Sequence, residues 1–147
     1  MVEPVPKHHR IVGVILKNNE ILLIHRVKPE RDYYVWPGGK IESGESEEQA
    51  LRREMKEELN FEIGRSKYLF TIDYSDHDEI YYLVGEFSGV LTLGGPEKER
   101  MSAQNKYSFN WVKLGDLNKV PNLVPAEAVE KILFELSSKS QIKILIF

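Results

Sequence analysis

The chain has 147 residues, of which 41% are hydrophobic and 29% charged, and its formal net charge at pH 7 is -3. These values fit a single globular domain with its own core, and they argue against a general nucleic-acid-binding protein, which would carry a basic surface. The absence of cysteine excludes a disulfide framework, a thiol nucleophile and a zinc–thiolate site. The sequence shows neither a membrane-spanning run nor the apolar segment of a signal peptide, so we expect a cytoplasmic protein without a membrane partner.

Two strands joined by a tight turn are expected near the N-terminus, within one domain that covers residues 1–147. Residues 1–8 are predicted to be a loose tail. The apolar run of Arg10 to Lys17 predicts the first strand, Asn18-Asn19 the turn, and Glu20 to Arg26 the second strand. Continuous apolar runs of this kind are typical of strands that are buried on both faces.

A basic loop over Val27 to Tyr34 is expected after the second strand, with Arg26 at its start. Trp36 and Pro37 then lead into a pair of glycines. We interpret Trp36 as a core residue rather than a substrate contact, because large aromatic side chains most often pack in the interior.

The glycine pair opens the most informative stretch, which ends with an acidic helix. Ser46 followed three residues later by Gln49 predicts a capping box at the helix start. Asn60 is a residue type that tolerates the left-handed conformation in which many helices end. Three apolar residues recur every four positions and predict a buried stripe on this helix: Leu51, Met55 and Leu59.

Three carboxylates lie beside that stripe, on Glu54, Glu57 and Glu58. Side chains three and four positions apart lie on adjacent ridges of a helix, where like charges repel. A bound cation would turn this repulsion into ligation, and hard oxygen ligands favour Mg2+ or Mn2+. The alternative is an ordinary solvated helix face with surface ion pairs of little energetic value.

Alternating strands, turns and one further helix are expected after the acidic helix. In chain order they are strands over Glu62 to Thr71 and Glu79 to Phe87, a strand over Asn105 to Lys113, a short helical turn over Leu114 to Leu117, a helix that buries Ala128, Ile132 and Leu136, and an apolar end over Ile142 to Phe147. That end predicts either a last strand or a dimer contact, so a homodimer is one possible assembly.

The stretch from Gly39 to Phe61 resembles the Nudix box, G-x5-E-x7-R-E-U-x-E-E-x-G-U, in which U is a bulky apolar residue. Gly39, Glu45 and the run Arg53-Glu54-Met55-Lys56-Glu57-Glu58 occupy its fixed charged and glycine positions. The sequence departs from the pattern at Asn60, where the family has glycine, and at Phe61, where it has an aliphatic residue. A match of this length is far more specific than a lone glycine motif.

This resemblance implies an α/β fold, the Nudix fold, in which a mixed β-sheet lies between helices as an α/β/α sandwich. It also implies a divalent-metal-dependent pyrophosphohydrolase that cleaves a nucleoside diphosphate linked to another moiety by attack of water on phosphorus. The substrate stays open among nucleoside triphosphates, nucleotide sugars, ADP-ribose and similar small nucleotides. The alternative is a catalytically weak or inactive Nudix-fold module that binds nucleotides and regulates.

By the same resemblance, Glu54, Glu57 and Glu58 bind Mg2+ or Mn2+, with the backbone carbonyl of Gly39 as a further ligand. Glu54 could also help as a base. Arg53, counted with the catalytic residues, is expected to tie the helix to its loop through Glu45 rather than to touch the substrate.

Outside the box, the family pattern suggests four substrate-site residues: Arg26, Asn122, Glu97 and Glu99. Arg26 could reach the substrate phosphates, or it could be an ordinary surface arginine. Asn122 could read a base, although an asparagine beside prolines is usually a turn residue. Glu97 or Glu99 could supply a general base, since the positions nearest the following strand carry amides and not acids, or both could lie in a solvated loop.

Overall fold

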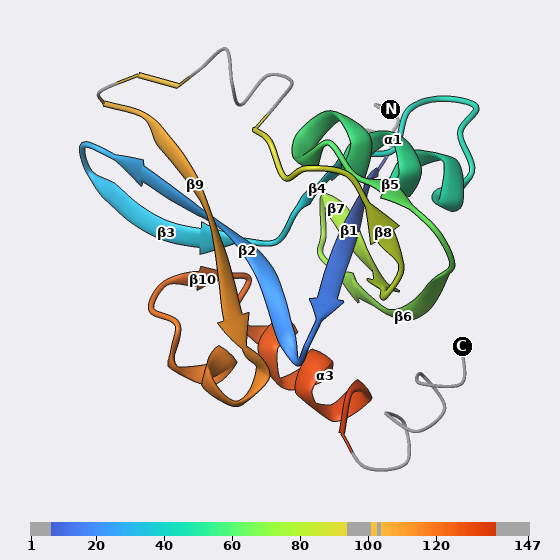
Figure 1. Ribbon diagram of the computed structural model, residues 1–147. Coiled ribbons are helices and arrows are strands. Elements are labelled where there is room, and N and C mark those ends of the chain that lie inside the picture. Colours follow the sequence, from blue (N-terminus) through green and yellow to red (C-terminus); the bar gives the residue numbers. More distant parts are fainter. Residues whose placement is uncertain (1–6, 94–100, 103, 138–147) are drawn as a thin grey trace.

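The computed structural model describes residues 7–93, 101–102 and 104–137 of the chain, drawn as ribbons in Figure 1. Its elements are, in order, β1 (His8–Lys17), β2 (Glu20–Lys28), β3 (Arg31–Val35), β4 (Gly38–Lys40), α1 (Glu47–Leu59), β5 (Glu62–Ile63), β6 (Ser66–Asp73), β7 (His77–Val84), β8 (Phe87–Ser88), β9 (Lys106–Lys113), η1 (Leu114–Lys119), β10 (Leu123–Val124) and α3 (Glu127–Glu135). The predicted C-terminal segment from Ile142 to Phe147, and both Glu97 and Glu99, lie outside the described residues.

Eight strands of the described part of the chain form one mixed sheet. The order is β10-β3-β2-β1-β7-β6, with β4 paired to β1 and β9 paired to β2. The pairs β1–β7 and β10–β3 are parallel, and the other neighbouring pairs are antiparallel. The mixed sheet that the family resemblance implies is therefore confirmed.

The sheet opens between its two central strands. β1 and β2 pair only next to their connecting turn, at Leu16 with Ile21 and at Lys17 with Glu20. Beyond that point β1 pairs with β4, whereas β2 pairs with β3 and β9, so the two strands diverge from a common end (Figure 1). This divergence leaves the opening in which the candidate site lies.

Each face of the sheet carries one hydrophobic cluster and one helix. Ile11 and Ile15 of β1 pack in the cluster that α1 covers, and Val12 and Val14 pack in the cluster that α3 covers. This alternation follows from the period of two along a strand. The helices contribute the predicted apolar residues to these clusters: Leu51, Met55 and Leu59 from α1, and Ala128 and Ile132 from α3, with Leu136 directly after it. The α/β/α sandwich is thus confirmed.

Two expectations about the N-terminal half are wrong. Val27 to Tyr34 is not a loop, because β2 continues to Lys28 and β3 pairs back onto it from Arg31. The pairing brings the ring of His25 to 4.3 Å from that of Tyr34 and its Nε2 to 2.5 Å from Asp32. Cross-strand contacts of this kind stabilise a hairpin whose charged sequence reads as a loop. In addition, β1 begins at His8, which was assigned to the tail.

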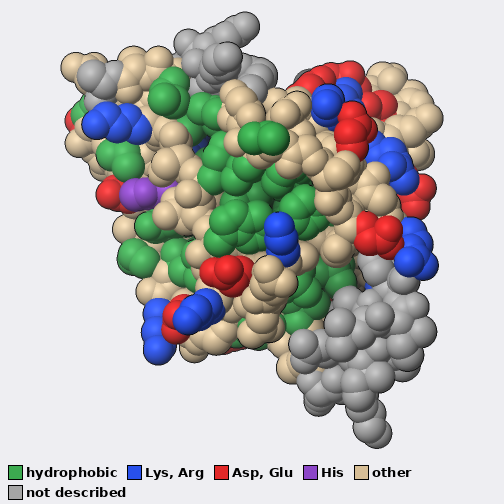
Figure 2. Space-filling view, viewed as in Figure 1, with side chains coloured by type: hydrophobic (Ala, Val, Ile, Leu, Met, Phe, Trp, Pro, Cys, Tyr) green, Lys and Arg blue, Asp and Glu red, His purple; other side chains and the backbone are tan. Residues whose placement is uncertain are grey.

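The surface matches an ordinary globular chain. Figure 2 shows hydrophobic side chains gathered in the middle of one face and charged side chains toward its margin. In the part of the chain that the structure describes, neither helix has the length and apolar character needed to cross a bilayer.

Candidate active site

Helix α1 positions the candidate catalytic residues, and both of its ends are fixed as the sequence predicts. Ser46 Oγ accepts a hydrogen bond from the Gln49 N–H at 3.1 Å, and the Gln49 side chain accepts one from the Ser46 N–H at 2.8 Å. The helix ends at Asn60, which adopts the left-handed conformation with φ 64°. Satisfied end groups hold the helix in register with the loop before it.

The two glycines of β4 let that loop pass close to its neighbours. A Cβ on Gly38 would lie 2.2 Å from the Ile11 carbonyl oxygen, and a Cβ on Gly39 would lie 2.3 Å from Glu54 Oε1. Neither contact is possible for a real side chain. The strand pairing therefore needs glycine at position 38, and the close approach of the Glu54 carboxylate needs glycine at position 39.

The predicted metal-binding carboxylates line one cavity of about 540 Å³. Glu58 is 5% exposed and accepts a long hydrogen bond of 3.4 Å from the Gly38 N–H. Glu54 lies against Gly39, while the side chain of Glu57 is half exposed. Glu42 adds a fourth carboxylate to the lining. A buried carboxylate among others of like charge is costly without a compensating cation, so this set of hard oxygen donors fits a divalent metal.

The carboxylates share the cavity without gathering around one point. Among the described residues, no three acidic or histidine side chains are placed to ligate a single ion. Arg53 explains the arrangement, because its Nη1 lies 2.9 Å from Glu54 Oε1 and 3.3 Å from Glu57 Oε2. The spacing along the helix therefore brings all three carboxylates into one cavity, as expected, but their oxygens do not surround a single point as metal ligands would.

Arg53 also joins the helix to the glycine loop. Its Nε and Nη2 donate to the two carboxylate oxygens of Glu45 at 2.6 and 2.8 Å, and Nη2 donates to the Lys40 carbonyl at 3.0 Å. The hydrogen bond from Arg53, followed by that from the Glu42 N–H, lowers the pKa of Glu45 to about 2. The same pairing raises the pKa of Arg53 further above its ordinary value. These contacts match the predicted role of a link between helix and loop.

Arg26 faces the carboxylates from the other half of the opened sheet. It lines the same cavity, and its Nη2 donates to the Tyr107 hydroxyl at 2.5 Å. Its guanidinium lies 4.5 Å from the ring centre of Tyr107 and 5.4 Å from that of Tyr33. Two aromatic rings hold the cation in place, and its buried Nε has no hydrogen-bond partner among the described residues. The position suits the predicted contact with substrate phosphates.

Asn122 lies elsewhere. It has φ 55°, its side-chain amide donates to the Asp32 carbonyl at 3.1 Å, and its own carbonyl accepts from the Tyr34 N–H at 3.0 Å. It lines a different hollow from the carboxylates. These contacts are those of the turn residue that was the alternative interpretation, so its role as a base reader stays a prediction without support from its position.

Further cavity residues were not singled out from the sequence as site residues. Glu42 and Lys40 flank the loop, Arg10 comes from β1, and the indole of Trp36 brings a buried N–H that has no partner among the described residues. Glu42 and Lys40 could have been found from their closeness to Gly39. Arg10 gives no such signal, because only the pairing of β1 with β4 brings it to the site.

Comparison with known proteins identifies the family. The NUDIX domain family model matches residues 7–132. An 8-oxo-dGTP diphosphatase from Buchnera aphidicola subsp. Schizaphis graminum is 26% identical over 130 residues, which is 84% of this chain and 94% of that protein. An ADP-ribose pyrophosphatase from Methanocaldococcus jannaschii is 34% identical over 113 residues, 76% of this chain and 63% of that protein.

Solved structures share the fold. The MutT NUDIX hydrolase from Burkholderia pseudomallei superposes with a TM-score of 0.69 at 28% identity, covering 87% of this chain and 99% of that one. A MutT structure from work on Aliivibrio salmonicida and Vibrio cholerae superposes with a TM-score of 0.72 at 24% identity, covering 88% of this chain and 99% of the other. The box, the cavity it lines and these matches agree, and the chain belongs to the Nudix family as a Nudix hydrolase.

Proposed function

We propose that this Nudix hydrolase is a divalent-metal-dependent pyrophosphohydrolase of small nucleotides, which cleaves a nucleoside diphosphate linked to another moiety. One observation carries the proposal: Glu54, Glu57 and Glu58 line the same cavity as the cation of Arg26. Phosphoryl transfer needs charge neutralised on the phosphate oxygens, and a cavity with acidic and basic walls can supply it. Relatives named for 8-oxo-dGTP and for ADP-ribose support the nucleotide class.

A divalent cation, Mg2+ or Mn2+, would be held by Glu54, Glu57 and Glu58 with the Gly39 carbonyl, and would neutralise phosphate charge and lower the pKa of a bound water. Arg26 would bind the substrate phosphates with the donors that Tyr107 does not use. Arg53 keeps Glu54 beside Gly39 and the loop against the helix. The chain thus supplies a rigid acidic wall and a fixed cation on opposite sides of the cavity.

In the reaction, a water oxygen bonds to one phosphorus of the pyrophosphate. The bond from that phosphorus to the bridging oxygen breaks, and the electron pair leaves with the departing phosphate. The water proton passes to a carboxylate within hydrogen-bond reach. Glu97 and Glu99 stay predictions for this role because they lie outside the described residues, and Glu54 is the alternative inside the box.

The test is hydrolysis of a panel of nucleoside triphosphates, nucleotide sugars and ADP-ribose in H2(18)O, with products identified by mass. With Mg2+ or Mn2+ we expect turnover and one labelled oxygen in a phosphate product. Excess EDTA should abolish it. Turnover that persists in EDTA contradicts metal dependence.

A matched pair of variants separates the site from the rest of the helix. Glu57→Gln should lose most of the turnover, whereas Glu48→Gln should keep it, because Glu48 is an exposed residue of α1 that does not line the cavity. A folded parent protein that binds nucleotides and turns over none of them would instead support the regulatory module.

A further inference from the structure

A second hollow lies beside the site cavity, on the side of β1 and β4. Its volume is about 280 Å³, and five residues line it: His8, Arg10, Lys40, Asp76 and His77. Arg10 and Lys40 also line the site cavity. The two spaces therefore adjoin at this pair of cations.

The pairing of β1 with β4 forces the two cations together. Arg10 and Lys40 are directly opposite Cα partners in this antiparallel pair, and both residues are exposed. Like charges directly opposite each other in a sheet destabilise it. No ion pair involving either side chain occurs among the described residues. An anion between them would convert the repulsion into two attractive contacts.

The acidic residues along this edge are already engaged by other partners. Glu79 is the Cα neighbour of Arg10 on β7, but its Oε1 accepts from the Tyr81 hydroxyl at 2.8 Å and its Oε2 lies 3.4 Å from His77 Nε2. The other acidic side chains of this edge contact residues other than Arg10 and Lys40: Asp76 lies 2.8 Å from His77, Asp78 lies 2.7 Å from His9, and Asp73 accepts from Lys7. Among the described residues, none of these acidic side chains forms an ion pair with Arg10 or Lys40, so the two cations can contact an anion.

We propose that Arg10 and Lys40 form a subsite for a further phosphate of the substrate, beyond the pyrophosphate that is hydrolysed. The preferred substrates are then polyphosphate chains longer than a diphosphate. A guanidinium binds two phosphate oxygens with its planar fork, and an ammonium adds a compact charge beside it. This assignment rests on the proposed function, since it extends the same cavity.

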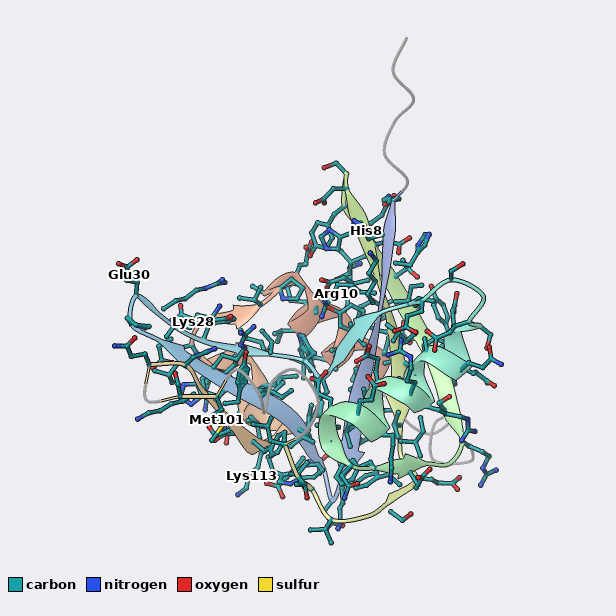
Figure 3. The ribbon with its side chains drawn as sticks, turned by 90° about the horizontal axis from the view of Figure 1, so that it is seen from above. His8, Arg10, Lys28, Glu30, Met101 and Lys113 are labelled. Atoms are coloured by element: carbon teal, nitrogen blue, oxygen red, sulfur yellow. The ribbon has the colours of Figure 1, made fainter. Side chains whose placement is uncertain are left out.

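The test uses dinucleoside polyphosphates with the same two adenosines and two to five phosphates between them. The parent enzyme should show a kcat/KM that rises with chain length. Arg10→Gln and Lys40→Gln should each reduce the ratio of kcat/KM between the longest and shortest substrates by about 10-fold, as expected for one charge-assisted contact. Lys113→Gln is the matched control, because Lys113 is an exposed lysine far from Arg10 (Figure 3).

A binding experiment without turnover supports the kinetics. Calorimetric titration with inorganic tripolyphosphate should give a Kd about 10-fold weaker for Arg10→Gln than for the parent and for Lys113→Gln. The melting temperature of Arg10→Gln should equal or exceed that of the parent, because a repulsive pair is removed.

The outcomes separate the two proposals. If neither this series nor the panel of nucleoside triphosphates, nucleotide sugars and ADP-ribose is hydrolysed with Mg2+ or Mn2+, the proposed function fails. If the panel is hydrolysed and kcat/KM does not rise with chain length in the series, the subsite is overturned. If the series is hydrolysed and the ratio between long and short substrates is the same in Arg10→Gln, Lys40→Gln and the parent, the subsite is overturned while the proposed function stands.

Discussion

Replacing Gly39 by alanine should impair catalysis without unfolding the protein. The new Cβ would lie 2.3 Å from Oε1, 2.4 Å from Cδ and 2.5 Å from Oε2 of Glu54. The clash is with the end of a flexible side chain and not with backbone. Gly39 does not have a positive φ, so alanine adds no backbone strain there. The protein therefore relieves the clash by moving the Glu54 carboxylate.

The size of that movement sets the expected effect. Ordinary contact with a Cβ begins at about 3.4 Å, so the carboxylate must retreat by about 1 Å from its position at 2.4 Å. A displacement of this size at a reacting centre can cost about 100-fold in rate, or roughly 2.7 kcal/mol. The retreat also disturbs the 2.9 Å hydrogen bond from Arg53. We expect kcat to fall by about 100-fold and the melting temperature to change little.

The assay is steady-state kinetics at saturating Mg2+ together with thermal unfolding of the same samples. Gly115→Ala is the control, because a Cβ on Gly115 would meet nothing within 4 Å. An unchanged kcat in Gly39→Ala would refute the reasoning, since it would mean that the position of Glu54 against the loop has no bearing on the reaction. A large loss of stability would equally contradict the assignment of the clash to a side chain that can move.

Four further predictions concern stability and the division of labour along the helix. Gly38→Ala should destabilise the fold by roughly 1–3 kcal/mol in chemical denaturation, because its Cβ would lie 2.2 Å from a backbone carbonyl of β1. Leu51→Ala should cost roughly 2–5 kcal/mol in the same assay, because Leu51 is fully buried, while the protein that remains folded keeps its activity. Glu58→Gln should lower turnover by about 100-fold or more and leave the melting temperature equal or higher, because buried like charge is removed; an active, folded variant would contradict metal binding by this residue. The ion pair of Glu45 with Arg53 should stabilise the fold fully above pH 4.5, and this contribution should disappear as the pH falls toward 2, because the folded-state pKa of Glu45 is lowered from 4.5 to about 2. Melting curves of the parent and Glu45→Gln should therefore converge in acid, and a constant difference would contradict the pairing.

Local signals predicted the parts of the fold that depend on neighbours in sequence. The capping box at Ser46, the left-handed Asn60 and the turn at Asn18-Asn19, with φ 51° and 64°, are all confirmed. Each of these depends on a few adjacent residues whose side chains or backbone preferences decide the conformation. The buried stripe of Leu51, Met55 and Leu59 is confirmed for the same reason, because the spacing of four residues depends only on the geometry of a single helix.

Features that depend on strand pairing were beyond the sequence. The charged sequence of the β2–β3 hairpin is typical of a loop. The hairpin forms because of cross-strand contacts such as that of His25 with Asp32, which the sequence alone does not show. Arg10 reaches the site only because β1 pairs with β4. For the carboxylates of α1, the spacing along the helix correctly predicted that they share one cavity. It did not predict the direction of the Glu54 oxygens, because that direction depends on the hydrogen bond from Arg53. Spacing in sequence fixes neither long-range register nor the rotamers of competing side chains.

Asn60 stands where the Nudix pattern has glycine, and it makes a contact that glycine cannot make. Its side-chain amide donates to the Val90 carbonyl at 3.0 Å, and Thr92 N–H donates to the Leu59 carbonyl at 3.1 Å beside it. The end of α1 is thereby joined to the chain at Val90 and Thr92. A glycine at position 60 would preserve the left-handed turn and lose the contact with Val90, so this departure from the family pattern adds a point of attachment between the end of α1 and the chain that follows β8.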